Sequence, residues 1–157
     1  MEQAHINTPL GCCLIEGNEH GVSRIWVLDD DVPVSDIVPA ELQEAVSQIH
    51  DYFKGKRNSF DIKLNPAGTE FQKMVWNALL EIPFGKTMSY HQLAVKLGDV
   101  KAIRAVASAN GKNPLWIVVP CHRVIGTDGS LTGYAGGLWR KKWLLEHETP
   151  SAQGTLF

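Results

Sequence analysis

The chain has 157 residues, of which 44% are hydrophobic and 20% charged, enough for one domain or two small units that share a core. No run approaches the roughly 18 apolar residues of a membrane span. The opening "MEQAHINTPLG" lacks the basic-then-apolar order of a secretory signal. Three cysteines, two of them adjacent, make a poor disulfide framework. We therefore expect a cytoplasmic protein with no membrane partner.

The net charge of −2 is unevenly distributed along the chain. Residues 1–83 carry six basic and 13 acidic side chains, whereas residues 84–143 carry nine basic and two acidic ones. This asymmetry favours a polyanionic partner for the second segment. A solvated basic face is the alternative.

The first third of the chain predicts a small α+β unit over residues 1–64. Residues 10–29 indicate two strands around a Gly/Asn turn, and residues 32–41 form a Pro-rich loop. Residues 39–55 predict an amphipathic helix. Its apolar side chains recur at helical spacing: Leu42, Val46, Ile49 and Phe53. Residues 59–64 alternate apolar and polar side chains, as a half-buried strand does.

The remainder, 65–149, predicts a mostly helical domain, followed by a mobile tail over 150–157. Thr69 is placed to cap a helix over 70–82, with Phe71, Val75, Leu79 and Ile82 on one face. The predicted fold class is therefore α+β, with the helical part following the mixed unit.

Two short helices then indicate a helix-turn-helix. Ser89 is placed to cap the first, 90–98, and the second covers 101–109. A Gly-rich loop, 126–138, leads to a last helix over 139–148.

The second helix of the pair carries small side chains. After Arg104 come Ala105 to Ala109, so only Arg104 and Asn110 could reach base edges as a major-groove reader does. The small face favours close approach to a backbone or to the minor groove, with the arginine as a probe. A helix packed against its neighbours is the alternative.

The stretch "VVPCHRVIG", residues 118–126, places Cys121 next to His122. A free thiol has a pKa of about 8.5, so reactivity requires a base or a positive charge nearby. Neighbours in an extended strand point to opposite faces, so His122 would need a turn or a bridging water. Glu148 is a candidate to orient that base. A buried structural cysteine is the alternative.

A metal site is a weaker interpretation of the cysteines. The candidate ligands would be His5, Cys12, Cys13 and His20. Their spacing matches no zinc pattern, and strand cysteines are usually small buried apolar residues.

Three blocks together resemble the O6-alkylguanine-DNA alkyltransferase family, the methylated-DNA–protein-cysteine methyltransferases. They are "IPFGKTMSYHQLA", "AIRAVASANGKNPLWIVVPCHRVIG" and "LTGYAGGLWRKKWLLEHE". The resemblance is close over residues 65–148 and looser in "TPLGCCLIEG". It implies a ribonuclease H-like N-terminal unit and a DNA-repair activity. It also implies association with the nucleoid if the source is bacterial.

The resemblance implies three catalytic residues. Cys121 would be the acceptor nucleophile, His122 would take the thiol proton through a water, and Glu148 would orient that histidine. Asn113 matches a hinge that holds the recognition helix against the active-site segment.

The resemblance also implies substrate and DNA contacts. Arg104 matches a finger that replaces the extruded nucleotide, Tyr90 a residue that rotates the phosphate and binds the base, and Tyr134 a pocket tyrosine. The further expected substrate contacts are Ala135, Val124 and Gly136. The further expected DNA contacts are Ala105, Asn110, Ser89 and Arg123.

These matches lead to an expected reaction. An alkyl group on guanine O6 lies inside the stacked duplex, so the base must be flipped out before a thiolate can attack it. Nothing in the chain indicates a second thiol or a cofactor to regenerate the cysteine, so each monomer would act once on double-stranded DNA. We expect no metal, because Asn18 and Ser23 occupy positions where zinc-binding relatives need a cysteine and a histidine.

Two other functions compete with this one. An alkyltransferase-like lesion-binding protein would lack the cysteine, which is present as Cys121. A helix-turn-helix regulator would need long side chains on its second helix.

The last five residues, "QGTLF" (Gln153 to Phe157), resemble the peptide by which bacterial repair proteins dock on the sliding clamp. The alternative is that Leu156 and Phe157 pack back onto the domain.

Overall fold

A computed structural model describes residues 1–131 and 133–149. The chain divides into two compact units. The first contains Met1–Ala67 and Pro114–Val118, and the second contains Gly68–Asn113 and the chain from Val119 onward. The mixed first part and the helical second part confirm the predicted α+β class.

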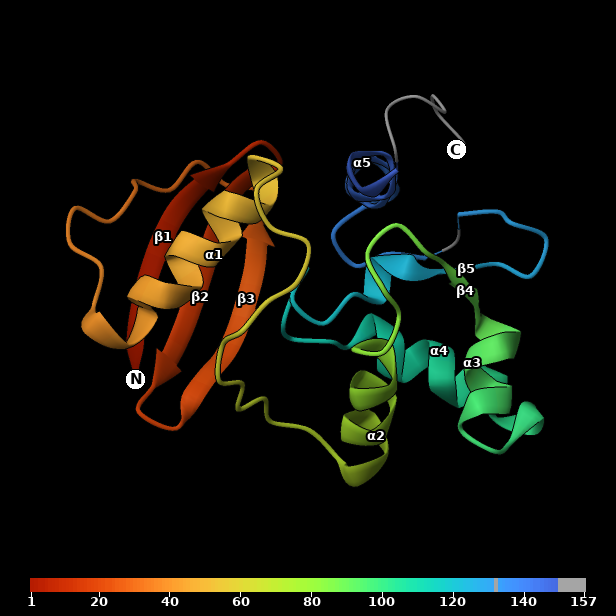
Figure 1. The fold of residues 1–157 in the computed structure, drawn as a ribbon. Coiled ribbons are helices and arrows are strands. Elements are labelled where there is room, and N and C mark those ends of the chain that lie inside the picture. Colours follow the sequence, from red (N-terminus) through yellow and green to blue (C-terminus); the bar gives the residue numbers. More distant parts are fainter. Residues whose placement is uncertain (132, 150–157) are drawn as a thin grey trace. The chain divides into compact units, whose positions relative to one another are not determined.

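The first unit is a three-stranded antiparallel sheet with one helix along a face (Figure 1). Its elements are β1 (Glu2–Thr8), β2 (Gly11–Asn18), β3 (Gly21–Leu28), the 3₁₀ turn η1 (Ala40–Leu42) and α1 (Gln43–Phe53). The strands pair in register through Ala4, Ile15 and Ile25, which are fully buried. The two strands and the helix were predicted, but β1 was not. In "EQAHINT" only two side chains are buried, so its apolar pattern is too short to indicate a strand.

The predicted strand over residues 59–64 is wrong. This segment forms a single parallel bridge, between Leu64 and Val22. The backbone of Asp61 is instead satisfied by the Gln48 side chain, which accepts from its N–H at 2.8 Å and donates to its carbonyl at 3.0 Å. A buried amide from α1 thus replaces the neighbouring strand.

Residues 114–118 belong to the first unit, whereas the sequence placed them in the second. The Ile25 N–H donates to the Pro114 carbonyl and the Trp116 N–H to the Ile25 carbonyl, both at 2.9 Å, so the segment lies beside β3. Ile117 has a φ of 71°, a left-handed conformation that a β-branched residue rarely adopts.

The second unit is mostly helical (Figure 1). Its helices are α2 (Glu70–Leu79), α3 (Tyr90–Lys96), η2 (Val100–Ala102), α4 (Ile103–Gly111), η3 (Cys121–Arg123) and α5 (Leu138–Glu148). Thr69 and Ser89 form the predicted caps, each in a capping box with the glutamine three residues later. The Trp76 indole donates to the Ala109 carbonyl at 2.8 Å and thereby fixes the end of α4 to α2.

A two-stranded parallel sheet closes this unit around the cysteine segment. β4 (Met88–Ser89) pairs with β5 (Val124–Ile125), which brings the start of α3 beside the residues that follow Cys121. In the described ranges, 1–131 and 133–149, no helix is long and apolar enough to cross a bilayer.

Candidate active site

Cys121 begins the 3₁₀ turn η3 and is buried, with 7% of its surface exposed. Pro120, with φ −82° and ψ 65°, forms an inverse γ-turn in which the Cys121 N–H donates to the Val119 carbonyl at 2.8 Å. The chain therefore turns at the cysteine instead of continuing as a strand. This turn removes the geometric objection to a partnership between Cys121 and His122.

Asn113 connects the end of the helix-turn-helix to this segment. Its Nδ2 donates to the Val119 carbonyl at 2.7 Å, and its side chain also hydrogen-bonds to the Cys121 thiol. The amide of Asn110 lies 3.5 Å from the Cys121 carbonyl. Asn113 thus makes the contact that the predicted hinge role requires.

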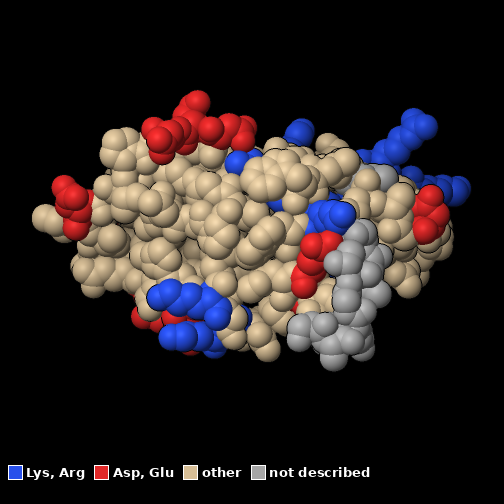
Figure 2. Space-filling view, turned by 90° about the horizontal axis from the view of Figure 1, so that it is seen from above, with Lys and Arg blue, Asp and Glu red and all other residues tan. Residues whose placement is uncertain are grey.

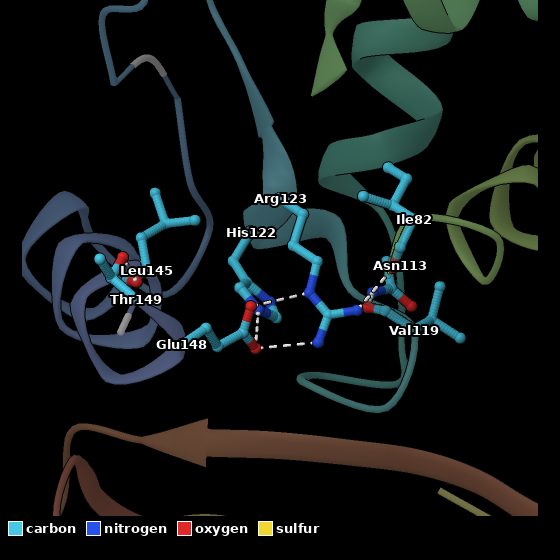
Figure 3. Close-up of polar contacts among 8 residues, drawn as sticks. All are labelled: Ile82, Asn113, Val119, His122, Arg123, Leu145, Glu148 and Thr149. Carbon is cyan, nitrogen blue, oxygen red and sulfur yellow. Dashed lines mark hydrogen bonds and ion pairs between the residues drawn. The ribbon is translucent and has the colours of Figure 1, made fainter. Parts of the chain in front are cut away.

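A buried ionic cluster joins η3 to the end of α5 through His122, Arg123 and Glu148 (Figure 3). The Nε2 of His122 is 2.8 Å from the Oε2 of Glu148. Arg123 donates to both oxygens of the same carboxylate, from Nε at 2.8 Å and from Nη2 at 2.9 Å. Its third nitrogen, Nη1, donates to the Ile82 carbonyl at 2.7 Å.

The cluster fixes the state of the histidine. Burial alone would raise the pKa of Glu148, but its pairing with His122 and Arg123 outweighs burial and holds that pKa well below the usual range. Burial lowers the pKa of His122 despite the carboxylate beside it. A neutral imidazole facing a carboxylate through Nε2 carries its proton there, so Nδ1 presents a lone pair. Among the described residues Nδ1 has no hydrogen-bond partner.

Cys121 is a resting thiol and not a preformed thiolate. Burial raises its pKa above the usual value, and the Asn113 side chain, the charge of Lys141 and the Tyr134 side chain only partly offset this. A base must therefore take the proton when the thiol reacts. The lone pair on His122 is the group in this unit that fits that need.

Lys141 is a site residue that the sequence-based analysis missed. Its side chain is fully buried in α5, and burial lowers its pKa from 10.5 to about 8. The charge acts on Cys121, and Nζ lies 5.9 Å from the centre of the Tyr90 ring. Residues 141, 144, 145 and 148 share the buried face of the helix. The sequence signal that could have identified it is a lysine among the apolar residues of the buried face of this helix.

We predict that Lys141→Met stabilises the folded protein and slows the reaction of the Cys121 thiol with alkylating agents. The depressed pKa means that the unfolded chain binds more protons between about pH 8 and 10.5, so Lys141 costs the native state about 3 kcal/mol at pH 7. The variant should unfold at a higher urea concentration than the native protein at pH 7. It should also lose the gain in stability that the native protein shows from pH 8 to 9. Its thiol should react more slowly with iodoacetamide, because the cation that favours the thiolate is gone. Lys142→Met, which removes an exposed cation of the same helix, should change neither property.

A cavity of about 660 Å³ collects several predicted residues. It is lined by Tyr90, His91, Ile103, Arg104, Ala107, Gly111, Thr127, Gly133, Tyr134 and Ala135. Tyr90, Arg104, Tyr134 and Ala135 were predicted, whereas His91 and Thr127 were not. The volume is that of a pocket for a ligand the size of a nucleobase or larger.

Two of the residues predicted to contact DNA are buried. Asn110 and Arg123 are 2% and 6% exposed, and both side chains are engaged inside the unit. Arg123 is needed there because His122 is neutral, so the buried Glu148 carboxylate would otherwise lack a cationic partner. Ala105 is exposed on α4. The Ser89 hydroxyl is engaged as the cap of α3.

Two predicted substrate contacts lie outside the cavity wall. Val124 is fully buried in β5, and Gly136 is buried with its carbonyl accepting from Arg140 at 2.9 Å.

The surface of the basic segment, residues 84–143, carries fewer cationic side chains than the sequence suggests. Of its nine cations, Arg123, Arg140 and Lys141 are buried. On the face shown in Figure 2, acidic and basic side chains lie in small groups, some of them adjoining, between broad uncharged areas. Exposed Arg104 is the cation that lines the cavity. In the described part of the chain, no three His, Cys, Asp or Glu side chains gather as a metal site would require.

Comparison with known proteins agrees with this geometry. Residues 1–66 match the ribonuclease-like domain, and residues 70–150 the DNA-binding domain, of 6-O-methylguanine DNA methyltransferase. A methylated-DNA–protein-cysteine methyltransferase of Methanosarcina barkeri is 47% identical over 150 residues, covering 91% of this chain and 94% of that protein. One of Mycobacterium tuberculosis is 43% identical over 155 residues, covering 96% and 94%.

Solved structures show the same relationship. The crystal structure of M. tuberculosis O6-methylguanine methyltransferase superposes with a TM-score of 0.84 at 41% identity, covering 96% of each chain. A structure from the same organism in complex with DNA superposes with a TM-score of 0.85, covering 94% of this chain and 93% of that one. The helix-turn-helix and the buried residues Cys121, His122 and Glu148 thus place the protein in a class of DNA-binding proteins that use a cysteine as acceptor. The chain belongs to the 6-O-methylguanine DNA methyltransferase family.

Proposed function

We propose that Cys121 accepts an alkyl group from the O6 atom of guanine in double-stranded DNA. The chain is a methylated-DNA–protein-cysteine methyltransferase, and it repairs DNA by direct reversal. The observation that carries the assignment to Cys121 is the state of its neighbours. A buried thiol precedes a neutral His122, whose proton is held on the side of Glu148.

The reaction follows from these groups. His122 takes the thiol proton at Nδ1, through one water, and the thiolate attacks the alkyl carbon. The carbon–oxygen bond breaks, the thioether forms, and the guanine leaves with the electron pair. Tyr90 and Tyr134 line the cavity that would hold the base. The thioether is stable, so each molecule acts once.

The substrate base must leave the duplex to reach the cavity, at a cost of a few kcal/mol. Arg104 is exposed on α4 at the cavity wall, where its guanidinium would occupy the space left by the extruded nucleotide. The small side chains Ala105 and Ala107 let the helix approach the minor groove closely.

Mass spectrometry of the intact protein tests this assignment. After incubation with a duplex that contains one O6-methylguanine, the protein should gain the mass of one methyl group, located on the peptide with Cys121. Cys121→Ser should gain nothing, and Cys13→Ser should still gain one group. Cys13 is a suitable control because burial raises its pKa to about 12. Methylation of any other residue, or of none, would refute the assignment.

We further propose that residues 153–157 bind a sliding clamp, although these residues lie outside the described part of the chain. The support is the match of "QGTLF" to the Q-x-x-L-F pattern. A clamp pull-down should capture the intact protein and lose it on deletion of residues 153–157. Equal capture of both proteins, or of neither, would dismiss the proposal.

Oligomeric state and location complete the proposal. We propose a monomer in the cytoplasm, associated with the nucleoid if the source is bacterial. Three free cysteines fit a reducing compartment, and the substrate is DNA. Light scattering after gel filtration tests the first part, and imaging of a fluorescent fusion tests the second.

A further inference from the structure

We propose that Arg140 is a positioning residue for the pocket loop, which is residues 133–137, and that Trp139 supports it. Through this loop Arg140 would set both the shape of the cavity wall and the reactivity of Cys121. The part that concerns alkyl substrates rests on the function proposed above.

The pocket loop is rich in glycine. Three of its five residues are glycines, and two of them, Gly133 and Gly137, have positive φ values of 25° and 95°. Glycine loses more conformational freedom on ordering than any other residue. The Gly137 N–H donates to the Tyr134 carbonyl at 2.9 Å, and this bond closes the turn.

Arg140 reaches back to this loop from the first turn of α5. Its Nη1 donates to the Gly136 carbonyl at 2.9 Å, and the residue is only 5% exposed. Burial strengthens a hydrogen bond from a charged donor. The guanidinium carbon also lies 4.5 Å from the centre of the Trp139 ring, a cation–π distance. Trp139 remains 57% exposed, and covering Arg140 is the role that its position offers.

The loop connects this contact to the reaction. Tyr134 and Ala135, next to Gly136, line the cavity, and the Tyr134 side chain acts on Cys121 by lowering the pKa of its thiol. A shift of the Gly136 carbonyl would therefore move a wall of the cavity and, with it, the tyrosine that lowers the thiol pKa. Small displacements of such groups cost large factors in rate.

The test compares Arg140→Met, Arg140→Lys and Trp139→Ala, with Lys142→Met as the matched control for loss of a cation from the same helix. One measurement needs no DNA. It follows alkylation of Cys121 by iodoacetamide across pH, scored on the Cys121 peptide. Arg140→Met should move the midpoint to higher pH, because Tyr134, which lowers the thiol pKa, is no longer held in place. Arg140→Lys, which keeps a donor for Gly136, should restore most of the native midpoint. The midpoint of Trp139→Ala should lie between those of the native protein and of Arg140→Met.

The second measurement is the rate constant of transfer from duplexes with O6-methylguanine or O6-benzylguanine. Arg140→Met should slow methyl transfer about tenfold. It should slow benzyl transfer less, because a less rigid cavity wall can move to accommodate the larger benzyl group. DNA affinity should be unchanged.

The proposal is overturned if Arg140→Met lowers the melting temperature but leaves the midpoint and the ratio of the two rates at native values. It is equally overturned if Lys142→Met reproduces the effects. If the native protein transfers no alkyl group but the midpoint still moves in Arg140→Met, the proposed function fails while the positioning role stands.

Discussion

Glu148→Gln should unfold at markedly lower denaturant concentration than the native protein and transfer alkyl groups far more slowly. The carboxylate accepts hydrogen bonds from Arg123 and faces His122, and 1% of its side chain is exposed. Its neutral replacement leaves the Arg123 guanidinium buried without a counter-charge. Breaking a buried pair in this way costs about 3–5 kcal/mol, a large share of a typical domain's stability of about 5–15 kcal/mol.

The loss of activity should exceed what the lost stability explains. A glutamine can present its N–H to Nε2 of His122, which would favour the tautomer with the proton on Nδ1. That tautomer cannot accept the thiol proton. General-base assistance is typically worth about 10²–10⁴-fold, and this is the expected fall in the rate of transfer by the folded protein.

The pH dependence gives an independent check on Glu148. Its pKa in the folded protein lies below the ordinary value, so its stabilising contribution is complete above about pH 4.5 and is lost as the pH falls. Glu148→Gln should therefore lose less stability on acidification than the native protein.

A matched control is Glu146→Gln, two residues earlier in α5. The Glu146 side chain is 35% exposed and lies 3.9 Å from Lys142. Such a pair contributes about 1 kcal/mol or less. If Glu148→Gln and Glu146→Gln had the same stability and the same rate, the role given to the buried cluster would be wrong.

Arg104→Ala should separate repair of the duplex from the chemistry of the thiol. Arg104 is exposed at the cavity wall, away from the buried cluster. Without it, the cost of extruding the base is no longer offset. A loss of about 1–3 kcal/mol corresponds to a transfer rate on duplex DNA about 10–100-fold lower. Transfer from a single-stranded oligonucleotide should fall much less, and iodoacetamide should modify Cys121 at the native rate.

Lys112→Ala is the charge-matched control for Arg104. Lys112 is exposed just beyond the end of α4 and does not line the cavity. Its loss should weaken phosphate attraction and therefore act equally on both substrates, and the effect should shrink at high salt. Equal losses on duplex and single-stranded DNA in Arg104→Ala would show that Arg104 also acts only through its charge.

The sequence by itself determined the features that depend on a few neighbouring residues. Thr69 and Ser89 cap their helices because the cap and its glutamine partner lie three residues apart. The helices α1 and α2 were predicted from the spacing of their apolar residues. The "PCHRV" block, with its accompanying motifs, indicated the acceptor cysteine and its family.

Only the tertiary structure decided which polar residues are buried together. Arg123 pairs with a carboxylate 25 residues away, a partner that its adjacency to Cys121 did not indicate. Lys141 faces the thiol because Leu144 and Leu145 direct that side of α5 inward. The segment 59–64 fails to form a strand because the Gln48 amide satisfies the backbone of Asp61. Each outcome depends on desolvation and on partners distant in sequence, and local patterns carry no information about either.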